Sequence, residues 1–169
     1  MNLNKGYVLV YDINNIKLHN YNTNDAIVDQ VIILEKNNKL AIIESPAFYD
    51  NKKELEQYIN LLNAKIDGVL LSYHMGGGTF LKNSKKYATH KADEYGYHSG
   101  EKDLIDNFTK VFRTPFDKNI YKITDYIAEG SITLADIKLN IIPIMPIECP
   151  EGKLYPFSLI RGFSVGLGL

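Results

Sequence analysis

The chain of 169 residues is poor in cysteine, lacks tryptophan and carries almost no net charge. Its single cysteine, Cys149, cannot close a disulfide within the chain, and no basic and apolar leader opens the sequence, so we expect a reducing, cytoplasmic location. Nineteen Lys and Arg residues oppose twenty Asp and Glu residues, which leaves no broad positive field for nucleic acid or an anionic membrane. No apolar run approaches the roughly 20 residues of a membrane-spanning helix. The sequence therefore predicts a protein that binds neither nucleic acid nor a membrane.

The residues that are present predict one globular domain. Apolar residues make up 45% of the chain and charged residues 23%, which is the balance of a folded protein and not of a disordered one. The length is close to that of a single domain, and no polar linker divides the chain. We therefore expect one domain over residues 1–169.

Two pairs of short segments with β-branched and aromatic residues open the chain. The pairs are residues 6–12 with 15–21, and residues 26–35 with 40–44. Asn14-Asn15 joins the first pair, and residues 36–39, with a second Asn pair, join the other. Because Asn tolerates the left-handed backbone of a tight turn, each pair predicts a β-hairpin.

Helical spacing appears twice. The first set of apolar residues is Leu55, Tyr58, Ile59 and Leu62, and the second is Leu104, Ile105, Phe108, Val111 and Phe112. The first set predicts a helix from about Asn51 to Asn63, with Asn51 and Glu54 spaced as a capping box. The second predicts another amphipathic helix, which ends before Pro115.

Three later segments predict strands. Residues 67–73 form a nearly uninterrupted apolar run, which is typical of a central strand covered on both faces. Residues 86–89 predict a further short strand. Residues 135–141 alternate apolar and polar side chains, the period of a half-buried strand.

Three local sequences sharpen this order of elements. Residues 40–46 (LAIIESP) form a strand that ends in an acidic residue, residues 69–78 (VLLSYHMGGG) form a strand and a glycine loop, and residues 141–152 end in a Pro-rich turn. Together they resemble the metallo-β-lactamase fold over residues 7–152. The resemblance implies an α/β protein, an αββα sandwich of mixed sheets with flanking helices, that is abbreviated in its C-terminal half.

The metal signature of that family is missing from the glycine loop. In the family, Thr-His-X-His-X-Asp-His places ligands for two cations on one loop, where they share a water molecule. If Ser72 is read as the Thr, the four ligand positions are held by Tyr73, Met75, Gly77 and Gly78. None of these is a normal zinc ligand. An alignment on the glycines leaves only His74, and Glu148 takes the place of a later His.

Two possible sites for a single metal ion stay open as alternatives. His74 and Glu148 are candidate ligands of one zinc, iron or manganese ion, although a structural His and a solvent-facing Glu explain them more simply. His90 and His98, among nearby acidic residues, offer further donors, and surface polarity is the simpler explanation.

The glycine loop and the tail suggest two other roles. Gly76, Gly77 and Gly78 present consecutive backbone amides that can cradle a phosphate, but a tight turn is the favoured alternative. Residues 154–169 are too apolar to remain in water, so they complete the core or form a homodimer interface.

Three functions follow from these observations. The first is a non-hydrolytic relative that binds a small molecule or a protein without a cofactor. The second is a hydrolase with a rearranged mononuclear metal site, and the third is a structural subunit of a homodimer.

Overall fold

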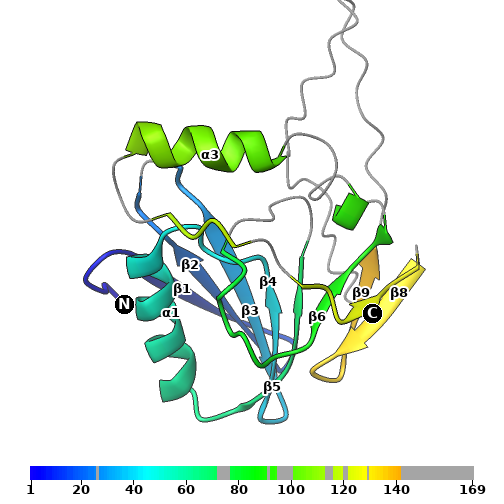
Figure 1. Cartoon of the computed structure of the whole chain (residues 1–169). Helices are drawn as coiled ribbons and strands as arrows, with labels where there is room; N and C mark the ends of the chain where they lie inside the picture. Colours follow the sequence, from blue (N-terminus) through cyan, green and yellow to red (C-terminus); the bar gives the residue numbers. More distant parts are fainter. Residues whose placement is uncertain are drawn as a thin grey trace, which may run out of the picture.

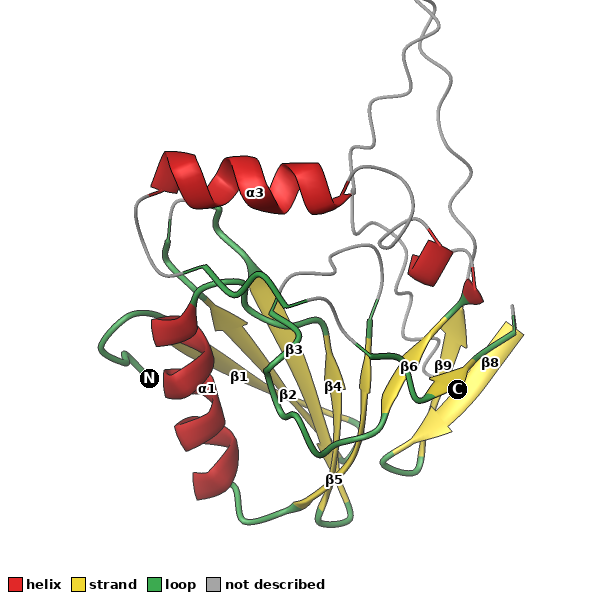
Figure 2. Ribbon diagram, viewed as in Figure 1, coloured by secondary structure: helices red, strands yellow, loops and turns green. Residues whose placement is uncertain are grey.

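A computed structural model describes residues 1–25, 27–71, 77–90, 92–94, 101–112, 116–119, 122–128 and 130–141. In this part of the chain a seven-stranded mixed sheet carries helix α1 on one face and a two-stranded hairpin on the other (Figures 1 and 2). The elements are β1 (Tyr7–Ile13), β2 (Ile16–Asn22), β3 (Gln30–Lys36), β4 (Lys39–Ile43), α1 (Tyr49–Leu61), β5 (Lys65–Leu70), β6 (Lys86–Ala88), α3 (Glu101–Phe112), β7 (Asp125–Tyr126), β8 (Gly130–Leu134) and β9 (Ile137–Ile141).

The two predicted hairpins are confirmed. β1 to β4 pair antiparallel in sequence order, and both tight turns contain an Asn pair with positive φ, 48° and 64° at Asn14 and Asn15 and 49° and 59° at Asn37 and Asn38. The third strand begins at Gln30 and not at Ala26, so its predicted start is wrong. The reason lies in the loop before it, where the Asp25 carboxylate accepts hydrogen bonds from two backbone amides and so holds a turn.

The buried run is a central strand, as the sequence predicts, but the strand spans Lys65–Leu70 and not residues 67–73, of which 72 and 73 lie outside the described residues. β5 lies between β4 and β6 and is parallel to both, and α1 makes the crossover from β4. α1 packs on one face of the sheet through Leu55, Tyr58 and Ile59, and these side chains join the first core, whose fully buried members include Val8, Tyr21, Val31, Ile33, Leu40, Ile42 and Val69.

The predicted capping box at Asn51 and Glu54 is wrong. α1 begins at Tyr49, and its N-cap Phe48 makes no side-chain cap, so Asn51 already lies inside the first turn. Both polar side chains face the sheet and bind other segments, because the open hydrogen-bonding groups of the chain start and of the loop after β2 lie there.

Hairpin β8–β9 covers part of the opposite face. Its apolar side chains pack on β3, β4 and β5 in a second core formed by Ile16, Leu34, Ala41, Ile43, Leu70, Leu134, Ala135, Ile137 and Leu139. The alternation predicted for residues 135–141 is confirmed in β9, while Ala135 and Asp136 form the turn before it with positive φ. Asp67 accepts a hydrogen bond from the Ala135 amide at 2.8 Å, which fixes this turn to β5. No helix in the described ranges is long and apolar enough to cross a membrane.

Candidate functional site

Three parts of the chain that are distant in sequence meet where β4 ends: the segment that runs from β4 into α1, the end of the glycine loop and residues 116–119. The Asp117 amide donates to the Ala47 carbonyl at 2.9 Å, and Phe48 forms an isolated β-bridge with Phe116. The Gly77 amide donates to the Asp117 carbonyl at 3.0 Å, and the hydroxyl of Ser45 lies 3.4 Å from the Gly77 carbonyl. The segment after β4, the start of α1, the end of the glycine loop and residues 116–119 therefore form one structural unit.

Asp117 is the centre of this unit. Its carboxylate is fully buried and accepts hydrogen bonds from Lys52, Thr79, Asn119 and Tyr49. Thr79 donates through both its amide, at 3.0 Å, and its hydroxyl, at 2.6 Å. Although burial raises the pKa of Asp117, the hydrogen bonds from Lys52, Thr79 and Asn119 outweigh it and hold the pKa far below its ordinary value. The carboxylate is therefore charged and saturated with donors, so it anchors the loops and has no room for a cation.

Lys52 supplies the opposite charge. Its ammonium lies 2.5 Å from Asp117 Oδ2 and 4.7 Å from the centre of the Tyr49 ring, and its side chain is buried. A buried carboxylate and a buried ammonium each lose several kcal/mol of hydration, so each requires the other. The pair joins the first turn of α1 to residues 116–119 and, through Thr79, to the glycine loop.

The backbone of the glycine loop is engaged inside the protein. The amides of Gly77 and Gly78 donate to the carbonyls of Asp117 and Asn119, at 3.0 and 2.7 Å. Gly77 also has a φ of 85°, which a side chain would strain. These facts favour the tight turn over the phosphate cradle at Gly77 and Gly78, and Gly76 lies outside the described residues.

Three of the four predicted metal donors, namely His74, His98 and Glu148, lie outside the described residues. His90 is described: its ring is stacked on that of Tyr126, with the centroids 3.9 Å apart. Within the described ranges, no three His, Cys, Asp or Glu side chains gather as metal ligands do. A metal at His74 and Glu148 therefore stays a prediction.

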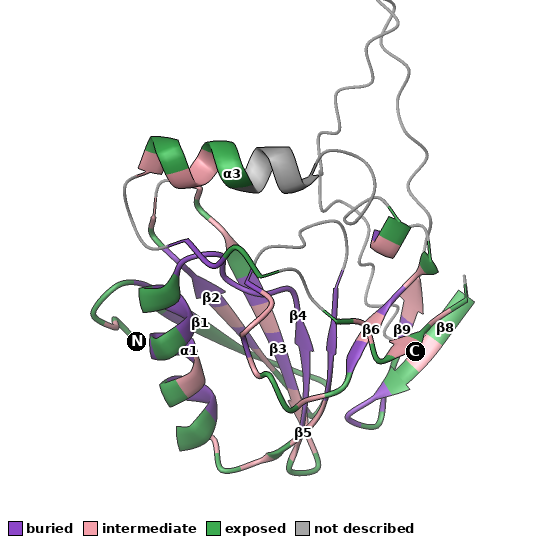
Figure 3. Ribbon diagram, viewed as in Figure 1, coloured by how far each residue is buried: buried purple, intermediate pink, exposed green. Residues whose placement is uncertain are grey.

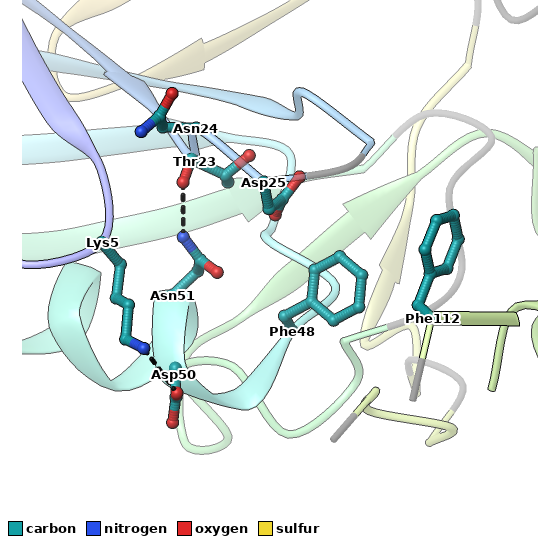
Figure 4. A pocket seen from close by; sticks show the side chains of 8 residues that line it. All are labelled: Lys5, Thr23, Asn24, Asp25, Phe48, Asp50, Asn51 and Phe112. Carbon is teal, nitrogen blue, oxygen red and sulfur yellow. Dashed lines mark hydrogen bonds and ion pairs between the residues drawn. The ribbon is translucent and has the colours of Figure 1, made fainter. Parts of the chain in front are cut away.

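A small pocket opens beside this unit, between the loop after β2 and the start of α1 (Figure 4). Its volume is about 190 Å³, and it is lined by Lys5, Thr23, Asn24, Asp25, Phe48, Asp50, Asn51 and Phe112. The Phe48 and Phe112 rings meet edge to face, with centroids 5.8 Å apart, and form an apolar wall. On the opposite side of the pocket, the side-chain amide of Asn51 donates a hydrogen bond to the Thr23 carbonyl at 2.8 Å. This bond attaches the loop after β2 to α1.

The charges around the pocket do not balance. Lys5 forms an ion pair with Asp50 at 3.1 Å, so the Asp25 carboxylate is the one charged group of the lining without an ion-pair partner among the described residues. Asp25 Oδ1 accepts from the amides of Ile27 and Val28, whereas Oδ2 is buried and has no hydrogen-bond partner in the described part of the chain. A buried, unpaired carboxylate oxygen requires a donor, and a ligand is one source of it.

Sequence reasoning missed the residues that organise the site. Asp117 and Lys52 are 65 positions apart and belong to residue types that are usually exposed, so no spacing links them. Asp25 and Asp50 gave no signal either. The one available signal was Thr79, because a hydroxyl residue directly after the glycines can bind a carboxylate there.

No protein-family model matches the chain, and no curated protein sequence does. Solved structures do: the metallo-β-lactamase TMB-1 is 16% identical with a TM-score of 0.52, and the match covers 79% of this chain and 58% of that one. The DIM-1 metallo-β-lactamase is 17% identical (TM-score 0.45; 79% of this chain and 57% of that one). A metallo-β-lactamase family protein of Thermus thermophilus is 11% identical (TM-score 0.46; 82% and 51%). The chain thus spans less than two thirds of the length of these proteins, and it has the metallo-β-lactamase fold.

Proposed function

We propose that the protein is a non-hydrolytic relative of the metallo-β-lactamases that binds a small organic cation in the pocket between the loop after β2 and α1. The observation that carries the proposal is Asp25, whose buried Oδ2 has no partner among the described residues and belongs to a side chain that lines this pocket. A ligand with a quaternary ammonium and a hydroxyl group offers such an oxygen both an opposite charge and a hydrogen-bond donor.

The chemistry of the ligand follows from the wall of the pocket. Phe48 and Phe112 present ring surface, and an ammonium or alkylammonium group is attracted to aromatic rings. Lys5 and Asp50 neutralise each other, so Asp25 leaves the lining with one net negative charge. A volume of about 190 Å³ admits a ligand with few heavy atoms.

The absence of dinuclear hydrolysis is supported by the donor set of the glycine loop. The fold family implies two metal ions, but two of the four ligand positions are glycines without a side chain, and the other two are Tyr73 and Met75. Gly77 and Gly78 moreover use their amides to hold Asp117 and Asn119. These residues do not fit a dinuclear centre, so we derive no reaction through one.

Titration with a matched pair of probes tests the binding site. Choline carries a quaternary ammonium, and 3,3-dimethyl-1-butanol has nearly the same shape without the charge. We expect choline alone to shift the backbone amide resonances of residues 23–25 and 48–51 in ¹⁵N–¹H spectra. Asp25→Asn abolishes the shifts, whereas Asp12→Asn, an exposed residue of β1 that does not line the pocket, leaves them unchanged. Equal shifts with both probes, or none with either, contradict the proposed ligand class.

Elemental analysis of the purified chain tests the second part of the proposal. We expect less than one equivalent of zinc, iron or manganese after growth with these metals, in the protein as purified and without chelation. One firmly held ion that is lost in a His74→Ala or Glu148→Ala variant supports the mononuclear hydrolase instead, and two ions per chain contradict the proposal directly.

A further inference from the structure

β1 is an edge strand with an exposed apolar face (Figure 3). Four alternate residues of this strand point to the side of the sheet that carries hairpin β8–β9, and their exposed fractions are 36% for Tyr7, 42% for Leu9, 49% for Tyr11 and 37% for Ile13. Ile13 pairs with Ile16, a member of the second core, so this stripe extends that core outward. Such a row of large apolar side chains on a strand edge is unusual in a protein that stays monomeric.

Among the described residues, this strand has few of the protections of a free edge: Met1 and Asn2 cover its start, and Asp12 is its one charged residue. Natural edge strands carry Lys or Pro, are very short, or contain a bulge that turns the backbone away. β1 reads YVLVYDI over seven residues, and its register with β2 runs unbroken from Tyr7–Asn22 to Ile13–Ile16. An open edge of this kind is a template for another strand.

The backbone shows which residues face outward. Met1 and Val8 exchange two hydrogen bonds, from the N-terminal ammonium to the Val8 carbonyl at 2.8 Å and from the Val8 amide to the Met1 carbonyl at 2.9 Å. Along an antiparallel strand, the backbone N–H and C=O groups of every second residue point toward the same neighbour. Those of Val10 and Asp12 therefore point away from β2, as those of Val8 do. Met1 and Asn2 thus occupy the edge at Tyr7 and Val8, and no described residue pairs with the outer edge of residues 9–13.

We propose that β1 pairs antiparallel with β1 of a second copy of the chain, centred on Tyr11. In this register Leu9 lies opposite Ile13 of the second copy, Val10 opposite Asp12, and Tyr11 opposite Tyr11. The apolar stripes then lie side by side across a two-fold axis, and a single surface patch meets its own copy. No like charges face each other, because Asp12 meets Val10 and has Lys17 as its neighbour on β2.

The proposed interface is small. It consists of a five-residue ladder and half-exposed side chains, which is less than a tight, permanent dimer buries. We therefore expect a dimer in exchange with the monomer, populated between micromolar and near-millimolar concentration. The proposed interface is separate from the one that the sequence predicts for residues 154–169, which lie outside the described residues.

Sedimentation velocity over that concentration range, on the full chain, tests the proposal with two substitutions on adjacent residues. Tyr11→Lys places two ammonium groups opposite each other and abolishes the dimer. Val10→Lys is equally exposed, at 48%, but its ammonium meets Asp12 of the second copy, so the dimer persists or becomes stronger. Circular dichroism confirms that both variants are folded. A wild type that stays monomeric, or a dimer that Tyr11→Lys leaves intact, overturns the proposal.

Cysteine cross-linking tests the register independently. In a Cys149→Ser background, Tyr11→Cys brings two thiols into a directly opposed pair with Cα atoms about 4.5 Å apart, within the range of a disulfide. Ile13→Cys leaves its thiols four residues out of register, roughly 13 Å apart. Mild oxidation therefore yields a covalent dimer with Tyr11→Cys and not with Ile13→Cys. Equal cross-linking of both variants, or of neither, contradicts the register.

Discussion

The buried Lys52–Asp117 pair predicts a large loss of stability when either partner is removed. Lys52→Met keeps the length of the side chain but leaves Asp117 as an uncompensated buried charge. Asp117→Asn keeps the shape but leaves the Lys52 ammonium, which is buried against Tyr49, without its counter-ion. Removing one member of a buried ion pair costs about 3 to 5 kcal/mol, and we expect each single variant to lie in that range.

The double variant carries the decisive information. Once both charges are gone, no unpaired charge is buried, so Lys52→Met with Asp117→Asn costs less than the sum of the single changes by about 1 to 3 kcal/mol. Thr79 and Asn119 still find a polar partner in the new amide, although its nitrogen accepts no hydrogen bond.

Urea unfolding followed by circular dichroism measures these differences. The matched control is Lys118→Met, because Lys118 and Asp106 form an exposed pair 3.9 Å apart, and its loss changes stability by less than about 1 kcal/mol. If Lys52→Met unfolds as the control does, or if the single effects simply add, Asp117 is not the electrostatic anchor that we describe.

The same pair fixes the response to acid. The pKa of folded Asp117 lies below its ordinary value of 3.8, so the unfolded chain binds the proton at a higher pH than the folded chain does. Its contribution to stability is complete above about pH 4 and is lost as the pH falls toward the pKa of the folded state. Asp117→Asn therefore has a flatter stability profile than the wild type below pH 4, and a profile of equal slope contradicts the assignment.

Three further substitutions test other parts of the fold by the same unfolding assay. His19 of β2 is buried between the Tyr58 hydroxyl of α1, at 2.7 Å, and Glu35 of β3, at 3.0 Å. His19→Phe leaves both of these polar groups without their partner and lowers the free energy of unfolding by about 2 to 4 kcal/mol. An unchanged stability contradicts the view that His19 connects α1 to the sheet. A Cβ at Gly68 lies 2.5 Å from the Tyr87 ring, so Gly68→Ala costs about 1 to 3 kcal/mol, and Tyr87→Ala in the same chain should remove that penalty. Glu54 accepts from the Lys5 and Gly6 amides, and Glu54→Ala should speed hydrogen exchange at Gly6, while unchanged exchange there refutes this role.

The sheet was readable from the sequence because its signals are local. Asn pairs mark both turns, and the apolar run of β5 marks a strand covered on both faces. α1 was also readable from its spacing, but its start was not, because the polar residues of its first turn bind partners on the sheet and not their own helix. A capping pattern alone does not distinguish these two uses of the same side chains.

The candidate site was less readable, because its partners are distant in sequence. The residues of the glycine loop favoured a turn over a phosphate site, and the hydrogen bonds of Gly77 and Gly78 agree with that preference. Nothing in the sequence indicated that Asp117 would receive the loop, since a single Asp after a helix is typical of solvent-exposed surface. The unpaired oxygen of Asp25 depends equally on the loop conformation that brings the amides of Ile27 and Val28 to its other oxygen, and periodicity does not specify that conformation.

The first turn of α1 connects the two features of the site. Asp50 and Asn51 line the pocket, and the next residue, Lys52, holds Asp117. Loss of the Lys52–Asp117 pair therefore loosens the glycine loop and also moves one wall of the pocket. We expect Lys52→Met to weaken choline binding by at least several-fold under conditions where the variant is still folded, whereas Lys118→Met leaves binding unchanged. If Lys52→Met binds choline as tightly as the wild type does, the ion pair stabilises the fold without positioning the pocket, and the two features are independent.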